Sequence, residues 1–271
     1  IFRDKVLGIG NIVALMAPWN DPIYLTRVWC IFELFTSHRN NCNLTISMPP
    51  REKLSMIQTL STAEGISFLF EVFASTAVEN AQASEESDKT RILSMVRDTI
   101  GFEELNNEVN ILLREWVKKS ILQAVGELKS QYEEHTEDDP EMVVNRLAEI
   151  GHLCNQVGHA LDVNGEHEEA LRVLQTSLEM TRTAFGDDHL NCASSYGNIG
   201  LVLMNMGQYE NALAYFRNTL NIQQLSKETC ETTDMAKTVM SIGAACFQLD
   251  KYNDAMECYQ WSLNLFIDEL G

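Results

Sequence analysis

The sequence predicts a mostly α-helical protein whose residues 140–271 form an α-solenoid of stacked helical hairpins. Three six-residue segments superimpose in this part of the chain: Gly165–Ala170, Gly207–Ala212 and Asp250–Ala255. Their alanines lie 42 and then 43 residues apart. A fixed period of this length is typical of architectures in which each unit packs only on its neighbours. The repeat therefore sets the predicted fold class.

A small residue recurs inside each predicted unit. Gly158, Gly200 and Gly243 each stand twelve residues before the alanine of their unit. Glycine in a helix interior costs about 1 kcal/mol relative to alanine, so its recurrence at one register indicates a packing requirement. We expect two antiparallel helices to cross closely at each of these glycines, where a side chain larger than a methyl group would push the axes apart.

Apolar residues at helical spacing predict two helices in each unit. In the middle unit, Gly207-Gln208 separates the two apolar stripes. The first stripe consists of Tyr196, Ile199, Leu203 and Met206, and the second of Tyr209, Ala212, Leu213, Phe216 and Leu220.

This order of aromatic, apolar and glycine positions, followed by Gly-x-Tyr-x-x-Ala, Phe and Leu, resembles the tetratricopeptide repeat (TPR). The long period and the linker Phe185–His189 are similar to those of kinesin light chains. The units depart from the light-chain pattern because Asn155-Gln156, Gly197-Asn198 and Met240-Ser241 stand where that pattern has paired asparagines. The coiled coil that joins light chains to the motor is not in this sequence. The resemblance implies a cargo adaptor of the kinesin-light-chain type as an alternative function, whereas these departures argue against a motor role.

The resemblance implies a protein–protein interaction scaffold. In TPR arrays, the first helices of successive repeats line a concave groove that takes a partner peptide. Apolar side chains there would form pockets, and polar ones would meet the peptide backbone. The alternative is that these positions are ordinary surface residues of the array. Carried over by register, the groove-facing residues are His152, Asn155, His159, Asp162, Ser194, Leu201, Met204, Asn205, Lys237, Met240, Phe247 and Gln248.

Residues 1–50 predict a partial α/β segment. Asn11–Ala17 has the pattern of a buried strand and Leu44–Met48 that of a second strand. Leu25–Ser37 between them predicts an amphipathic helix with Thr26 as its N-cap. A short strand–helix–strand connection implies a parallel pair of strands.

The segment Trp29–Leu34, with the sequence Trp-Cys-Ile-Phe-Glu-Leu, resembles part of plant Toll/interleukin-1 receptor (TIR) domains. In enzymatic members of that family, the glutamate of this segment cleaves the nicotinamide–ribose bond of NAD, and only Glu33 would carry that role here. The resemblance implies an alternative function, an NAD-cleaving signalling enzyme with the repeats as its sensor. The first strand of such a domain lies outside this sequence, so we do not expect this chain itself to be an enzyme. The other interpretation of Glu33 is a solvated helix residue.

Residues 51–139 predict a helical connector. Arg51–Leu60 follows a double proline, where helices often begin, and Ile66–Ala74 is apolar enough to belong to a core. Ser87 or Asp88 is the expected cap of the next helix. Phe102–Glu134 predicts one long helix, followed by an acidic linker that sets the domain boundary at residue 140.

Charge and hydropathy narrow the classes of partner. The 271 residues carry a net charge of −19, which argues against nucleic acid and against anionic membranes. Either the acidic surface favours basic protein partners or it only keeps the protein soluble. The longest apolar runs are too short to span a bilayer. Because the chain opens on Ile1 without a signal peptide, we expect an internal piece of a longer, cytoplasmic protein.

The cysteines and histidines predict no cofactor and no metal site. The chain has seven cysteines, an odd number without a Cys-x-x-Cys motif, which is typical of reduced thiols in an intracellular protein. His152, Cys154, His159 and His167 lie near one another in sequence. However, Cys154 points away from the helix face of the first two histidines, and His167 takes the tyrosine position of the repeat.

Overall fold

The structure is a computed structural model that describes residues 6, 8–60, 77–134, 139–226 and 229–270. The predicted core segment Ile66–Ala74 lies outside these residues. The chain divides into two compact units, Ile1–Ala124 and Val125–Gly271. This division falls within helix α6 (Phe102–Glu134), whereas the boundaries expected from the sequence, at residues 50 and 139, stay a prediction.

The first unit contains the predicted strand–helix–strand segment. Strand β1 (Asn11–Leu15) pairs in parallel with β2 (Asn43–Ser47), and helix α2 (Val28–Arg39) lies between them in the chain. Asn11 is the register partner of Asn43, and their side-chain amides are hydrogen bonded at 2.9 Å. The predicted parallel pair is therefore confirmed.

The expectation that the first strand is buried holds for only one of its faces. Ala14 and the following Met16 are fully buried, whereas Val13 and Leu15 are 68% and 52% exposed. Successive side chains of a strand point to opposite faces. Within the described residues the sheet has two strands, and no described segment covers the face that carries Val13.

The predicted N-cap of the first helix is wrong. A short 3-10 helix, η1 (Ile23–Thr26), precedes α2, and the Thr26 hydroxyl donates back to the carbonyl of Ile23 at 2.8 Å. A distant segment supplies the partners at this helix start. The Gln82 amide donates to the carbonyl of Thr26, and the carbonyl of Gln82 accepts from the Val28 amide. A long-range backbone bridge thus replaces the expected local cap.

The connector is helical as predicted, with one difference in capping. Helix α3 spans Pro50–Leu60, the 3-10 helix η2 spans Val78–Asn80, and α5 spans Glu86–Thr99. The N-cap of α5 is Glu85 and makes no side-chain cap hydrogen bond, so neither Ser87 nor Asp88 has the expected role. In α6, the indole nitrogen of Trp116 donates to the carbonyl of Ile46 at 3.1 Å, which fixes this helix to β2.

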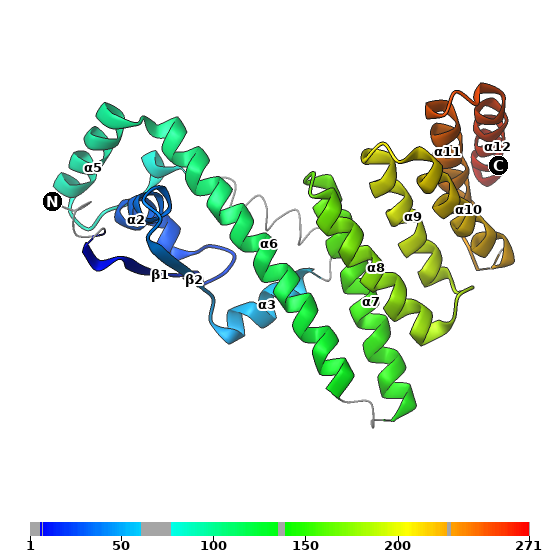
Figure 1. The fold of residues 1–271 in the computed structure, drawn as a ribbon, viewed down its shortest axis with the longest axis horizontal. Coiled ribbons are helices and arrows are strands. Elements are labelled where there is room, and N and C mark those ends of the chain that lie inside the picture. Colours follow the sequence, from blue (N-terminus) through cyan, green and yellow to red (C-terminus); the bar gives the residue numbers. More distant parts are fainter. Residues whose placement is uncertain (1–5, 7, 61–76, 135–138, 227–228, 271) are drawn as a thin grey trace. The chain divides into compact units, whose positions relative to one another are not determined.

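The second unit confirms the predicted solenoid of helical hairpins (Figure 1). Each repeat contributes two helices, and consecutive helices pack against each other along the array. The helices are α7 (Pro140–Val163), α8 (His167–Phe185), α9 (Leu190–Asn205), α10 (Tyr209–Leu225), α11 (Thr232–Gln248) and α12 (Tyr252–Leu270).

The three recurring glycines lie at equivalent helix crossings, as expected. A Cβ atom added at Gly158, Gly200 or Gly243 would lie 2.4, 2.5 or 2.9 Å from a side chain of the second helix of the same repeat, namely Leu174, Phe216 or Tyr259. Each of these side chains stands at the same register. Cβ contacts below 3.0 Å require something to shift, so glycine allows the two helices to approach.

A buried hydroxyl group beside each crossing is a feature that the sequence analysis missed. It belongs to the second helix of its repeat and donates to a carbonyl of the first helix, 26 residues earlier. The three pairs are Ser177 with Gly151 at 2.6 Å, Thr219 with Ala193 at 3.4 Å, and Ser262 with Ala236 at 2.8 Å. Each hairpin therefore has a buried hydroxyl–carbonyl hydrogen bond next to the close contact between the glycine and the facing apolar side chain.

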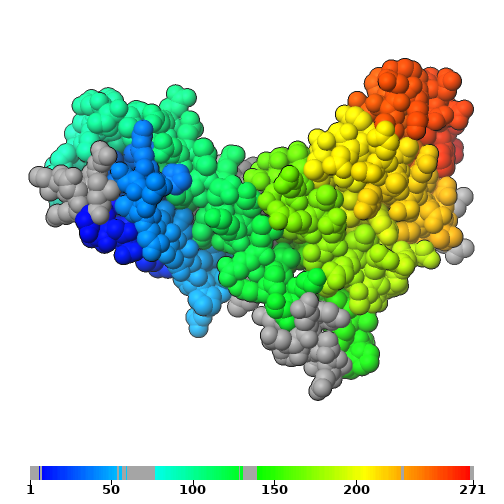
Figure 2. Space-filling view, in the orientation of Figure 1, coloured from blue at the N-terminus to red at the C-terminus, as the bar shows by residue number. Residues whose placement is uncertain are grey.

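Each repeat is covered by the next one, and Figure 2 shows the successive hairpins lying against one another. Leu213 in α10 is 5% exposed, whereas Met256, at the same register in α12, is 69% exposed. The outer face of α12 carries an exposed apolar stripe of Tyr252, Met256, Leu263 and Ile267. Within the described residues, no helix has the length and hydropathy needed to cross a membrane.

Candidate functional site

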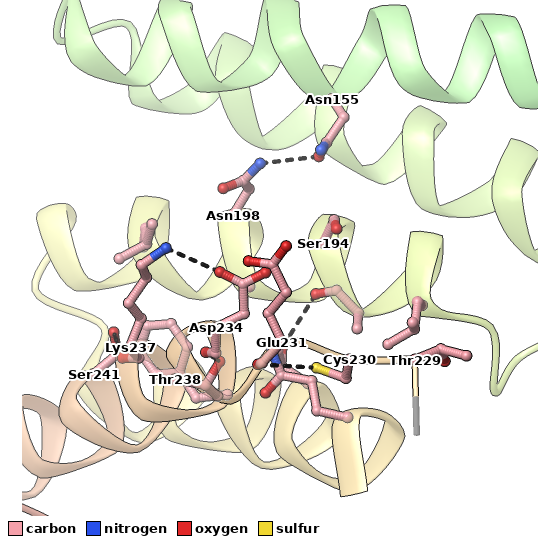
Figure 3. A pocket seen from close by; sticks show the side chains of 17 residues that line it. Asn155, Ser194, Asn198, Thr229, Cys230, Glu231, Asp234, Lys237, Thr238 and Ser241 are labelled. Carbon is pink, nitrogen blue, oxygen red and sulfur yellow. Dashed lines mark hydrogen bonds and ion pairs between the residues drawn. The ribbon is translucent and has the colours of Figure 1, made fainter. Parts of the chain in front are cut away.

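The main hollow of the array lies between the first helices of the second and third repeats. Its volume is about 520 Å³. Helices α9 and α11 form its two sides, and Phe216, Thr219 and Gln223 of α10 form its floor. Thr229–Glu231, at the start of the third repeat, closes one end. Figure 3 shows side chains from these elements surrounding the hollow.

Four of the predicted groove residues line this hollow: Asn155, Ser194, Leu201 and Lys237. A smaller hollow of about 220 Å³, between α7 and α9, adds His152 and shares Asn155 and Ser194. The two hollows follow each other along the first helices. Register alone therefore brings five of the predicted residues to one continuous surface.

The other predicted residues lie outside the linings of these two hollows. His159, Asn205, Met240, Phe247 and Gln248 are exposed, and Met204 is half-buried. Whether they contact a partner stays a prediction.

Asp162 is the predicted groove residue that the structure buries. It is 7% exposed, and both of its carboxylate oxygens have partners within the array. One oxygen lies 2.7 Å from Nδ1 of His167, and the other accepts from the Asn205 amide at 2.9 Å. Asp162 therefore joins α7 to α8 and α9, and its side chain is not available to a peptide.

A second polar contact also joins the first two repeats. The Asn198 amide donates to the side-chain oxygen of Asn155 at 3.0 Å, as Figure 3 shows. Both this pair and the Asp162–Asn205 pair are 43 residues apart. Sequence reasoning missed Asn198. The register equivalent of Asn155 in the second repeat is Gly197, and Asn198 follows it directly. A second asparagine so close to that register is the signal that could have identified Asn198.

A glycine lies in the lining of the main hollow. Gly197 lies in its lining, whereas Asn155 and Met240 occupy the equivalent positions of the first and third repeats. A Cβ atom at Gly197 would be 3.7 Å from Thr219, an ordinary van der Waals contact. Gly197 thus differs from Gly200, because its missing side chain opens space on the surface and not at a helix crossing.

The rim of the hollow carries two carboxylates and one ammonium group. Lys237 Nζ lies 2.9 Å from Asp234 Oδ1, and this hydrogen bond raises the pKa of Lys237. Glu231 is exposed and accepts a long hydrogen bond of 3.5 Å from the Thr233 hydroxyl. Because Asp234 and Lys237 neutralise each other, Glu231 leaves these three side chains with a net negative charge. Burial also raises the pKa of the neighbouring Cys230, which favours the neutral thiol.

Gln223 is a further site residue that sequence reasoning missed. It lies in the floor of the main hollow and is 7% exposed. Its Oε1 atom has no hydrogen-bond partner among the described residues. The equivalent residue in the first repeat is Thr181, whose hydroxyl donates to the carbonyl of Ser177 at 2.9 Å. An unpaired buried acceptor is thus particular to the larger hollow.

The candidate catalytic residue Glu33 lies in α2 of the first unit and is half-buried. Its carboxylate accepts from the Tyr24 hydroxyl at 3.0 Å. Burial and the negative charge of Glu33 raise the pKa of Tyr24, so this hydroxyl stays protonated. The catalytic role of Glu33 stays a prediction.

The cysteine and histidine residues considered as metal ligands do not form a metal site among the described residues. Cys154 is fully buried, and burial raises the pKa of its thiol to about 12, which disfavours the thiolate that binds metals. His167 contacts Asp162. Within the described residues, no three His, Cys, Asp or Glu side chains are grouped as metal ligands.

The repeats match a known family model. The tetratricopeptide repeat model matches residues 152–224 and 192–268. This part of the chain therefore matches tetratricopeptide repeats, and proteins with such repeats generally mediate protein–protein interactions. No curated protein sequence matches the chain. The match does not include residues 1–50, where the likeness to TIR domains is not confirmed.

Several solved structures are similar to this chain at low sequence identity. BtubC (BKLC) from P. vanneervenii is 14% identical with a TM-score of 0.44, over 90% of this chain and 91% of that one. A putative kinesin light chain of Podosopora anserina is 13% identical with a TM-score of 0.39, over 81% and 95% of the two chains. A Rap protein complexed with competence and sporulation factor is 17% identical with a TM-score of 0.38, over 79% and 75%.

Proposed function

We propose that this chain is a protein-interaction module that binds a peptide segment of a partner along its TPR groove, with the main hollow as the principal pocket. The observation that carries the proposal is the hollow itself. Its volume of about 520 Å³ falls within the range of about 300–1,000 Å³ typical of ligand pockets.

The lining of the hollow suits a peptide. Leu190 and Leu201 offer apolar surface to a side chain. Ser194, Asn198 and Ser241 offer groups that donate to and accept from a peptide backbone. This combination of apolar contact and a few polar groups is what orients a bound ligand.

The polar bonds between repeats support the proposal because they hold the groove in place. Asn155–Asn198 and Asp162–Asn205 join the first helices of the first two repeats. A groove that is formed before binding loses less conformational freedom when the peptide arrives.

The seven cysteines are free thiols. Persistent free thiols are typical of reducing compartments, which supports a cytoplasmic location for the proposed module.

Filling the hollow tests the proposal. The Gly197→Leu variant places a branched side chain in the lining without a helix crossing to disturb. We expect random dodecapeptides displayed on phage to be enriched by the immobilised wild-type chain. We expect the variant to bind the enriched peptides at least tenfold more weakly in fluorescence polarisation, because the leucine occupies the space that the peptide side chain needs.

The matched control is Gly126→Leu, which makes the same change at an exposed position of α6, where an added Cβ would meet no other described segment within 4 Å. This variant should bind the peptides like the wild type. Equal binding by wild type and Gly197→Leu, or no enriched peptide at all, would contradict the proposed function.

A further inference from the structure

The outer face of α12 is a second interaction surface, separate from the groove. We propose that it docks an amphipathic α-helix of a partner protein, whose apolar residues cover the α12 stripe and whose lysine or arginine residues lie along one edge of it. The α12 stripe consists of Tyr252, Met256, Leu263 and Ile267. None of these residues lines the main hollow, so this surface does not depend on the proposed groove.

The same face is covered in the two preceding hairpins. Leu178 of α8 packs against a buried cluster that includes Cys192 and Ala193 of α9. Leu263, at the same register of α12, is 51% exposed. The covering element is a helix in both cases, α9 on α8 and α11 on α10. The α12 stripe therefore continues an interface that occurs twice within the array, and a helix is the element that fits it.

One edge of the α12 stripe is closed by its own hairpin. Ala255 and Ser262, which directly precede two stripe residues, are buried, and the Ser262 hydroxyl donates to the carbonyl of Ala236 in α11. The residues that follow each stripe position lie about 100° further round the helix and form the open edge. This edge consists of Asn253, Glu257, Asn264 and Asp268, all of them exposed.

The open edge is acidic in α12 but not in the helices that the array covers itself. Glu257 and Asp268 carry its charges, whereas Ala214 and Leu225 stand at the equivalent positions of α10 and no acidic residue stands there in α8. The sequence of α12 contains no lysine, arginine or histidine. A helix with basic residues along its edge would therefore pair with both carboxylates, whereas a second copy of α12 would bring like charges together.

Selection from a library of helical peptides tests the inference. The displayed peptides have about 20 residues, enough to form a helix, with a fixed leucine stripe and with lysine or glutamate at random along its edges. We expect the immobilised 271-residue chain to enrich peptides with lysine along one edge. The dodecapeptides that probe the groove are too short to form stable helices in water, so the two selections address different surfaces.

Met256→Gln removes an apolar side chain from the α12 stripe. We expect it to weaken binding of one enriched helical peptide about tenfold or more in fluorescence polarisation, because the peptide no longer buries a methionine. The matched control is Met142→Gln, the same change at a position of α7 that is 48% exposed. This control and Gly197→Leu should bind the helical peptide like the wild type, and the melting curves of both methionine variants should match that of the wild type.

Charge reversal tests the open edge. We expect the wild type to bind the lysine-edged form of the enriched peptide about threefold or more tightly than its glutamate-edged form at low salt. The double variant Glu257→Lys and Asp268→Lys should prefer the glutamate-edged form. A reversal of the order would show that these two carboxylates, and not the net charge of the chain, set the preference.

The possible failures are distinguishable. If the wild type enriches no helical peptide, or if Met256→Gln binds the enriched peptide like the wild type, the docking face is wrong. If both peptide forms bind equally, or if the double variant keeps the wild-type order, the basic partner is wrong. Sedimentation velocity of the chain alone should show a monomer, and a dimer that Met256→Gln dissociates would overturn the inference in favour of a second copy. None of these results contradicts the groove, which the dodecapeptides and Gly197→Leu test.

Discussion

Gly200→Ala is expected to lower the free energy of unfolding by about 1–3 kcal/mol, the usual cost of overpacking a core. The added Cβ atom would lie 2.5 Å from the Phe216 ring, and Phe216 is 2% exposed, so the ring has little room to move. Alanine is the better helix former by about 1 kcal/mol, and the clash must exceed that gain. Urea unfolding followed by circular dichroism measures the change.

Gly197→Ala, one turn earlier in α9, is the matched control. Its Cβ atom meets Thr219 at 3.7 Å, so only the gain in helix propensity applies, and we expect stability to rise by about 1 kcal/mol. Opposite signs for two glycine-to-alanine changes in one helix would establish that Gly200 lies at a tight crossing. A stabilising Gly200→Ala would show that the helices do not approach as described.

Asp162→Ala is expected to lower the free energy of unfolding by about 2 kcal/mol, in the range of hydrogen bonds that involve a charged group. The substitution leaves His167 and Asn205 without the carboxylate that joins them. Because Asn205 belongs to the second repeat, we expect the first two repeats to unfold less cooperatively. Hydrogen exchange of α7 and α9 amides, together with urea unfolding, measures both effects.

Asn198→Ala provides the comparison for Asp162. It removes the other contact between α7 and α9, a neutral hydrogen bond to Asn155 between two half-buried side chains. We expect a loss of less than about 1 kcal/mol. Equal losses for the two variants, or no loss for Asp162→Ala, would mean that the buried carboxylate does not join the repeats.

The repeat architecture could be predicted because the same physical constraint recurs three times. One glycine in a helix has many explanations, but Gly158, Gly200 and Gly243 at one register have one in common, and all three meet a side chain of the facing helix. Helix α6 also has its predicted bounds, since its apolar spacing continues without a break.

The rest depends on contacts that periodicity does not encode. Thr26 has the chemistry of an N-cap, but the backbone carbonyl of Gln82 accepts from the Val28 amide at this helix start. Asp162 has the register of a groove residue, but His167 and Asn205 hold it inside the array. Gln223 has no distinguishing sequence pattern, because the lack of a hydrogen-bond partner for its Oε1 atom among the described residues can be recognised only in the structure.

Methyl NMR of the whole chain during titration with an enriched dodecapeptide tests the central claim most directly. The account predicts that the methyl signals of Leu190 and Leu201, which line the main hollow, shift or broaden as peptide is added. Those of Met256 and Leu263, on the outer face of α12, should stay unchanged. Shifts confined to α12 or to residues of the first unit, with Leu190 and Leu201 unaffected, would contradict a peptide-binding groove between α9 and α11.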